Sequence, residues 1–333
     1  MQLNNVVDCA AERQPADTAP LATAVQTNGI QNAVLPAAQF RREPRRRANC
    51  KARTAEPTGA AALEAGLGHA IRHNALEVHY QPQYELESGR SCGVEALARW
   101  TRTTGEIVAP SVFIPIAEQS GLIHALGASI LNAACLAMVA WERQNARSII
   151  LAVNVSAIQI NNNFLKVLIR ALEVSGFAAN RLELEITESA LMANTDLAIR
   201  CLTDWKNLGV RIALDDFGSG YSSLSHLSRL PVDCLKLDRS LVQMMTRDSK
   251  GARVMELMIE LGRKLEMDVI AEGVETEQQF QMLKDLNCPR VQGFLLARPM
   301  PETLAGMTLN RPWGNRAAPP QPMRNAAGDS HAH

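Results

Sequence analysis

The chain lacks an excess of charge of either sign, since 34 lysines and arginines balance 34 aspartates and glutamates. Proteins that coat nucleic acid or bind a membrane surface by charge usually carry a basic excess, so the composition supports neither class. The basic run at residues 41–47 is more often a solvated segment than a binding site, and no folded recognition motif accompanies it. We therefore expect no nucleic-acid contact.

The sequence also lacks the closely paired cysteines of a zinc or redox motif. Its seven cysteines are widely spaced and odd in number, and several lie in apolar stretches, where cysteine behaves as a small hydrophobe. No basic segment followed by an apolar run opens the chain, and we find no stretch with the roughly 18 apolar residues that a membrane span needs. The expectation is a cytoplasmic protein with reduced thiols and no membrane span.

Both ends of the chain lack sustained apolar periodicity. Residues 1–60 are rich in Ala, Gln, Asn, Thr, Pro and Arg, and residues 306–333 contain a cluster of prolines. Such segments bury too little apolar surface to offset the entropy lost on ordering. We predict a disordered basic arm at 1–60 and a flexible tail at 306–333, with one folded domain at 61–305.

Within that domain, apolar runs of strand type alternate with amphipathic helical stretches. The strand runs are residues 77–84, 93–100, 149–156, 182–188, 211–217, 234–239, 268–272 and 290–296. The helical stretches are 123–144, 164–175, 197–208, 251–265 and 277–286. A doubly wound sheet would need a glycine-rich loop after its first strand, and none follows Tyr80. The pattern predicts an α/β fold with a single (β/α)8 TIM-like barrel.

Polar side chains occur at or near the ends of all the predicted strands. In chain order they are Gln81, Glu95 with Arg99, Asn154, Glu185 with Glu188, Asp215 with Asp216, Lys236 with Asp238, Glu272 with Glu275, and Gln292. Active-site groups of such barrels come from the carboxyl ends of different strands. Carboxylate and amide oxygens are the ligands that Mg²⁺ and Mn²⁺ prefer. The pattern predicts metal-assisted hydrolysis of an anionic substrate.

Two consecutive carboxylates, Asp215 and Asp216, follow a short apolar run. Like charges this close repel or raise a pKa unless a cation neutralises them, which favours a shared site for two metal ions. The alternative is a turn or helix cap, because Asp before Gly and Ser is common in loops. The other oxygen ligands on neighbouring strands favour the metal interpretation.

Two basic residues and one further acid have both a functional and a structural interpretation. Lys236 lies in an apolar strand, so it is either a cation beside a phosphate or one half of a structural ion pair with Asp238 or a barrel carboxylate. Arg99 is either a phosphate ligand or part of an exposed salt bridge. Strand alternation places Glu183 and Glu185 on one face, so both acids are expected toward the barrel mouth.

Several short motifs carry a resemblance to a known family. They include Tyr80-Gln81-Pro82, Glu95-Ala96-Leu97, Val153-Asn154-Val155-Ser156, Asp215-Asp216-Phe217-Gly218, Lys236-Leu237-Asp238, Ala271-Glu272-Gly273-Val274-Glu275 and Val291-Gln292-Gly293-Phe294. Together they resemble the EAL family of bacterial cyclic-di-GMP phosphodiesterases over about residues 61–305. The resemblance implies a barrel with one reversed strand, two divalent cations (Mg²⁺ or Mn²⁺), and hydrolysis of cyclic di-GMP to linear pGpG.

The resemblance also implies a role for each site residue. The metal ligands would be Glu95, Asn154, Glu185, Asp215 and Asp216, with Asp215 shared between the two ions. The catalytic residues would be Lys236, which orients or activates water, Glu272, a ligand or proton acceptor, and Glu188, which anchors the loop at 217–223. The substrate-binding residues would be Gln81, Arg99, Asp238 and Gln292.

The resemblance further implies a homodimer through the barrel. Some EAL-like domains have lost catalysis and act as nucleotide receptors or protein-binding regulators, so a silent domain is the alternative function. This chain keeps every expected acid, the amide and the lysine, which favours the active hydrolase.

Overall fold

The structure is a computed structural model, and it describes residues 59–144, 147–218, 227 and 229–313. Nearly all of the expected arm at 1–60 lies outside the described residues, as do residues 219–226 and 314–333. The expectation that the two ends of the chain are disordered therefore stays a prediction.

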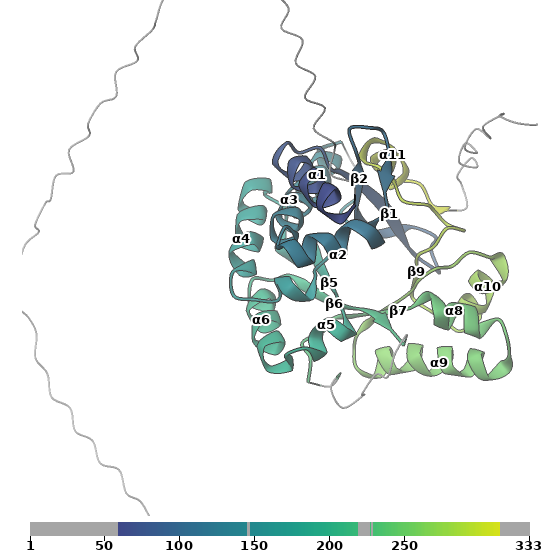
Figure 1. Ribbon diagram of the computed structural model, residues 1–333. Coiled ribbons are helices and arrows are strands. Elements are labelled where there is room, and N and C mark those ends of the chain that lie inside the picture. Colours follow the sequence, from purple (N-terminus) through teal and green to yellow (C-terminus); the bar gives the residue numbers. More distant parts are fainter. Residues whose placement is uncertain (1–58, 145–146, 219–226, 228, 314–333) are drawn as a thin grey trace, which may run out of the picture. The chain divides into compact units, whose positions relative to one another are not determined.

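The described residues form a closed barrel of eight strands, with helices outside it (Figure 1). The barrel strands are β1 (Glu77–Glu85), β2 (Ser91–Thr101), β4 (Ile150–Asn154), β5 (Leu182–Thr187), β6 (Arg211–Phe217), β7 (Cys234–Leu237), β8 (Asp268–Ala271) and β9 (Arg290–Val291). Two short strands, β3 (Ile107–Val108) and β10 (Met300–Pro301), pair with β2 and β1. The predicted (β/α)8 class is confirmed.

The first strand is the reversed one. β1 pairs antiparallel with both of its neighbours, β2 and β9, whereas every other adjacent pair around the barrel is parallel. A short turn joins β1 to β2, and a turn of that length can connect only antiparallel strands. The register places Gln81 opposite Glu95. The reversal therefore brings an amide from the first strand against the first carboxylate of the predicted site.

Helices cover the strands on the outside of the barrel. They are α1 (Ala60–Arg72), α2 (Pro110–Ser120), α3 (Ile123–Arg143), α4 (Phe164–Ser175), α5 (Glu188–Met192), α6 (Thr195–Asn207), α8 (Arg239–Met245), α9 (Ser249–Lys264), α10 (Glu277–Asp285) and α11 (Glu302–Thr308), with 3₁₀ turns η1 (Ala157–Gln159) and η2 (Ala179–Arg181). The predicted helix at 164–175 matches α4, and the other four predicted helices differ from the observed ones by a few residues at their ends.

Helix α3 corrects the expectation that no segment is long and apolar enough to cross a membrane. By length and composition its 21 residues pass that test, and it is the one such helix in the described part of the chain. A core helix passes the same test, and α3 buries Leu131, Met138 and Trp141 in the main hydrophobic core. Its apolar composition is thus explained by packing on the barrel strands.

A second apolar cluster lies between β2 and helices α1, α2 and α3. In it the rings of Trp100 and Phe113 meet edge to face, with 6.0 Å between their centroids. At the carboxyl end, α11 runs past residue 305, and Trp313 packs against Phe280 with 4.7 Å between ring centroids. Ordered packing therefore continues beyond the predicted boundary of the domain.

Candidate active site

Strand alternation places a polar layer inside the barrel. In β7, with the sequence Cys-Leu-Lys-Leu, Cys234 and Lys236 share one face and the leucines share the other. On β5 and β2, Glu185 and Glu95 are buried as well, at 1% and 7% exposure. Charged side chains are rarely buried this deeply unless they are paired or hold a metal. The burial therefore points to a functional arrangement.

Lys236 is the centre of this layer, because its ammonium group lies among four carboxylates from four different strands or strand ends. The distances from Nζ are 2.6 Å to Glu185 Oε1, 2.8 Å to Glu272 Oε1, 3.2 Å to Asp215 Oδ1 and 3.9 Å to Glu95 Oε2. One positive charge thus faces four potential negative charges. The ion pair that was the structural alternative for Lys236 is present, but with the predicted site acids and not with Asp238.

The excess of acid changes the protonation of the cluster. Burial raises the pKa of Glu272 to about 8 and the pKa of Glu185 well above its ordinary value, and neighbouring carboxylates add to both rises. Burial also opposes ionisation of Glu95, but Lys236 and hydrogen bonds from two amides hold its pKa below the usual value. Although burial disfavours the charged lysine, the carboxylates raise the pKa of Lys236 well above its normal value.

Three amide side chains fix the orientation of Glu95 and its surroundings. Gln292 Nε2 donates to Glu95 Oε2 at 2.6 Å and lies 3.2 Å from Gln81 Oε1. Asn154 Nδ2 donates to the other oxygen, Glu95 Oε1, at 2.7 Å. Gln81 Nε2 in turn donates to the carbonyl oxygen of Ala297 at 3.0 Å. The structure therefore brings Gln81, Asn154 and Gln292 to the carboxylate cluster.

The aspartate pair lies at a break in the regular strand. The pairing between β6 and β7 shifts register between Leu214 and Phe217, and Asp216 has a φ of 56°. Left-handed backbone is uncommon for a residue other than glycine and is concentrated at functional sites. In a regular strand Asp215 and Asp216 would point to opposite faces. Asp216 departs from that regular geometry, and burial together with Asp215 and Asp238 raises the pKa of Asp216.

Some predicted acids lie elsewhere. Glu183 does not reach the barrel mouth with Glu185, because it pairs with Arg211 Nε at 3.1 Å; Arg211 also contacts Asp268. The expectation that both glutamates of β5 face the mouth is therefore wrong: two residues along a strand move a side chain about 6.6 Å down the barrel. Asp238 caps α8, since its Oδ1 accepts from the Ser240 backbone N–H at 2.9 Å.

Glu188 is the first residue of α5, directly after β5. The segment it was expected to anchor is described only to residue 218, so the rest of that loop lies outside the described residues. Its role as a loop anchor therefore stays a prediction.

Two cavities flank Glu95. The larger, of about 580 Å³, is lined by residues of β2, α2 and α3, among them Leu97, Arg99 and Ile114. The smaller, of about 230 Å³, is lined by Gln81, Glu272 and Gln292 together with Phe294. Arg99 Nη1 donates to the carbonyl oxygen of Ala98 at 2.9 Å and forms no ion pair with a described residue, so its role as a phosphate ligand stays a prediction.

Helix α2, which forms one wall of the larger cavity, was not among the predicted helices. Ser156 Oγ donates to Glu118 Oε1 at 2.6 Å, which ties the loop after β4 to α2. The missed signal was Pro110, because proline favours the first position of a helix.

The donor set fits divalent cations. Oxygens of Glu95, Glu185 and Glu272 lie within 4.8 Å of one another. Glu185 Oε2 is buried and accepts no hydrogen bond from any residue the structure describes. A buried oxygen of this kind is costly unless something else satisfies it. Carboxylates in excess of the one lysine are the ligands that hard cations prefer.

Comparisons with known proteins identify the family of this chain. The EAL domain family model matches residues 64–299. The cyclic di-GMP phosphodiesterase NbdA of Pseudomonas aeruginosa is 40% identical over 266 residues, which are 80% of this chain and 34% of NbdA. MucR of the same organism, a bifunctional diguanylate cyclase/cyclic di-GMP phosphodiesterase, is 40% identical over 236 residues, 71% of this chain and 34% of MucR. The chain thus spans about a third of these relatives' length.

Solved structures are similar as well. The PaMucR phosphodiesterase in complex with c-di-GMP has a TM-score of 0.69 and 38% identity, covering 73% of this chain and 99% of that one. The EAL enzyme Bd1971, with cAMP and cyclic di-GMP bound, has a TM-score of 0.70 and 29% identity, covering 75% of this chain and 69% of that one.

Proposed function

Because the chain belongs to the EAL domain family, we propose that it hydrolyses one phosphodiester bond of cyclic di-GMP to give linear pGpG, with two divalent cations, Mg²⁺ or Mn²⁺. The observation that carries the proposal is the buried cluster in which Lys236 meets four carboxylates and Glu185 keeps an unsatisfied oxygen. A purely structural ion pair has no need of three excess acids.

The chain's own residues divide the work of holding the ions. Glu95, Asn154, Glu185 and Asp215 would hold one ion, and Asp215 with Asp216 would help to hold the second. When bound, such cations neutralise the phosphate and lower the pKa of coordinated water toward neutrality. The Asn154 amide would present its oxygen to the ion, which requires the reverse of its present orientation toward Glu95.

Lys236 and Glu272 would handle the proton and the orientation of water. Lys236 stays protonated because of its acidic neighbours, so it can donate hydrogen bonds but cannot act as a base. Glu272 Oε1 lies 2.8 Å from Lys236 Nζ. The raised pKa of this glutamate suits a group that accepts a proton near neutral pH, or one that loses its carboxyl proton and then ligates the metal.

The two cavities suit the two halves of a cyclic dinucleotide. Glu95 lines both of them, so a substrate with one base in each would place a phosphate near the carboxylate cluster. Arg99 in the larger cavity would bind a phosphate oxygen with its planar fork. Gln81 and Gln292, which line the smaller one, would orient the substrate or the carboxylate they contact, and Asp238 would contact the substrate from the start of α8.

Incubation of the purified chain with cyclic di-GMP tests the proposal. We expect pGpG to form with Mg²⁺ or Mn²⁺ and not in EDTA. The matched control is Glu173→Gln on an exposed part of α4, which removes one carboxylate without touching the cluster. Tight binding of cyclic di-GMP without any product, at every metal concentration, would establish the silent receptor instead.

Assembly and location belong to the same proposal. The resemblance supports a homodimer, which light scattering of the purified chain would detect as twice the mass of 36.3 kDa. The described cysteines are all free, which suits the reducing cytoplasm.

A further inference from the structure

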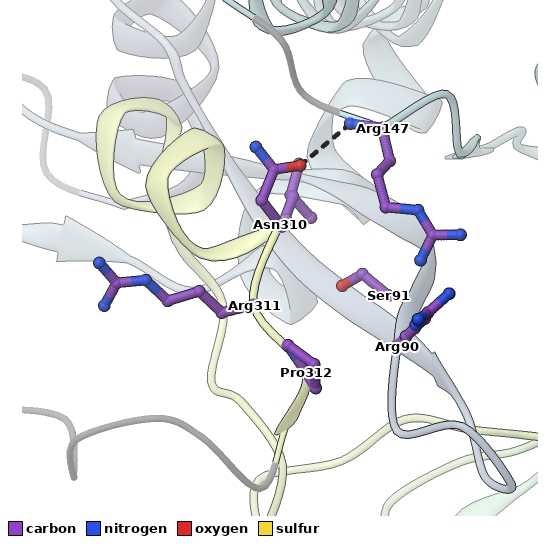
Figure 2. Close-up of a pocket in the computed structure, with 7 residues that line it drawn as sticks. Arg90, Ser91, Arg147, Asn310, Arg311 and Pro312 are labelled. Carbon is purple, nitrogen blue, oxygen red and sulfur yellow. Dashed lines mark hydrogen bonds between the residues drawn. The ribbon is translucent and has the colours of Figure 1, made fainter.

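A further cavity, with a different chemistry, lies at the opposite end of the barrel. Its volume is about 320 Å³, and Arg90, Ser91, Arg147 and Arg311 line it together with the segment 309–312 (Figure 2). Ser91 begins β2 and Arg147 shortly precedes β4, so the cavity lies at the amino-terminal ends of these strands. Glu95 is four residues further along β2, about 13 Å at the usual strand rise.

The cavity is strongly basic. Within the described residues, none of its three guanidinium groups forms an ion pair or a side-chain hydrogen bond. A single exposed arginine without a partner is ordinary, but three around one cavity repel one another and concentrate positive potential there. Arginine remains charged at any physiological pH. A bound anion would remove this repulsion.

Ser91 is an independent sign of a ligand. It is 3% exposed, and its Oγ has no hydrogen-bond partner among the described residues. In Figure 2 the guanidinium groups of Arg90 and Arg147 lie together beside Ser91, whose hydroxyl points toward the segment that carries Asn310 and Pro312. Arg311 extends to the other side of its segment. A buried hydroxyl without a partner is costly, so a ligand acceptor that it meets would be favoured.

The walls of the cavity are tied together by hydrogen bonds. The Arg147 backbone N–H donates to Asn310 Oδ1 at 3.1 Å, which joins the segment before β4 to the end of α11. The Trp313 backbone N–H donates to the Gly89 carbonyl oxygen at 2.8 Å, which joins the chain after α11 to the β1–β2 turn. A site whose walls are held in advance loses less entropy when it binds.

From these observations we propose that this cavity binds a phosphoryl group, with Arg90, Arg147 and the Ser91 hydroxyl as direct ligands and Arg311 as a source of positive potential. A phosphoryl group offers three acceptor oxygens and up to two charges, which matches two guanidinium forks and one hydroxyl better than a carboxylate does. The cavity would hold about ten waters at roughly 30 Å³ each, so there is room for a small organic group on the phosphate. The site does not depend on hydrolysis at the other end of the barrel.

Calorimetric titration of the full chain tests the site, in EDTA and with chloride used to match ionic strength. The probes are inorganic phosphate and, separately, glycerol 3-phosphate. We expect saturable binding that is weaker by about tenfold or more in Arg90→Gln, Arg147→Gln and Ser91→Ala, the usual scale for a hydrogen bond to a charged group. Arg311→Gln should have a smaller effect. Tighter binding of glycerol 3-phosphate identifies a phosphorylated small molecule as the ligand, and equal binding identifies free phosphate.

Two further variants serve as controls. Arg170→Gln removes an exposed arginine on α4, and Arg99→Gln removes the arginine at the catalytic end; neither should change the affinity. Ser91→Ala should keep the Tm of the wild type in phosphate-free buffer, because its hydroxyl has no partner to lose. The proposal is overturned by an absence of saturable binding, by equal affinity in Arg147→Gln and Ser91→Ala, by loss of binding in Arg99→Gln, or by a lower Tm for phosphate-free Ser91→Ala.

Discussion

Replacement of Lys236 by methionine tests the central feature of the site, one lysine held among four carboxylates. The side chain is 1% exposed and contacts Glu185 and Glu272 at 2.6 and 2.8 Å. Methionine keeps the length and the apolar stem but removes the charge. Loss of one partner from a buried ion pair costs about 3–5 kcal/mol, because the remaining charges stay buried without compensation.

The expected loss is large enough to measure by thermal unfolding. For a domain of this size 1 kcal/mol corresponds to about 2–4 °C, so Lys236→Met should lower the Tm by about 6–20 °C in EDTA. Saturating Mg²⁺ or Mn²⁺ should raise the Tm of the variant more than that of the wild type, because the cation replaces the missing charge. Turnover of cyclic di-GMP should remain very low even with metal.

Lys206→Met is the matched control. Lys206 also contacts a carboxylate at 2.6 Å, that of Asp233, but its side chain is 33% exposed. Such a pair contributes about 0–1 kcal/mol, so its loss should lower the Tm by no more than a few degrees. An equal Tm loss for the two variants in EDTA, or the same metal-induced rise in Lys236→Met and the wild type, would refute the electrostatic reasoning.

Four other outcomes are expected. Glu95→Ala should stay folded by circular dichroism yet lose several orders of magnitude in turnover, and near-normal hydrolysis would exclude Glu95 as a ligand. Ca²⁺ in place of Mg²⁺ should inhibit, since its looser shell misplaces the attacking water; full activity in Ca²⁺ alone would contradict this. Deletion of residues 1–55 should leave a soluble, active protein, whereas aggregation would show that the arm packs on the barrel. Glu188→Gln should loosen the loop and so weaken metal or substrate binding and dimerisation, with Glu185→Gln as the comparison for loss of a ligand; wild-type turnover, metal affinity and assembly would refute the loop-anchor role.

The sequence predicted those parts of the fold in which local pattern and burial agree. The strand at 211–217 and the helix at 164–175 were predicted to the residue, because each has a clear period and a marked end. Helix α2 was not predicted because Pro115 interrupts its helical pattern, and the packing of Phe113 against Trp100 stabilises it. Tertiary contacts of this kind have no local signature.

The candidate site shows the same division. From residue type and strand position we correctly predicted that Glu95, Glu185 and Lys236 lie close together. Neighbouring parallel strands run in the same direction, so side chains near their carboxyl ends meet at the same end of the barrel. Strand alternation could not separate Glu183 from Glu185, since both point inward and only depth distinguishes them. The basic cavity could not be predicted from the sequence, because Arg90, Arg147 and Arg311 lie far apart in the chain and form no motif.

The way the barrel closes also dictates when the site can exist during synthesis. β1 pairs with β9 through Tyr84 and Val291, and Gln81 meets Gln292 across 211 residues. Contacts between such distant parts of a chain form late, because closing a long loop costs entropy before the contact is made. A ribosome-bound chain that ends before β9 therefore already contains the carboxylates of the candidate site. The barrel is still open next to β1, and Glu95 lacks its hydrogen bond from Gln292. Assembly of the candidate site must therefore await the synthesis of β9 and of Gln292, which follows it.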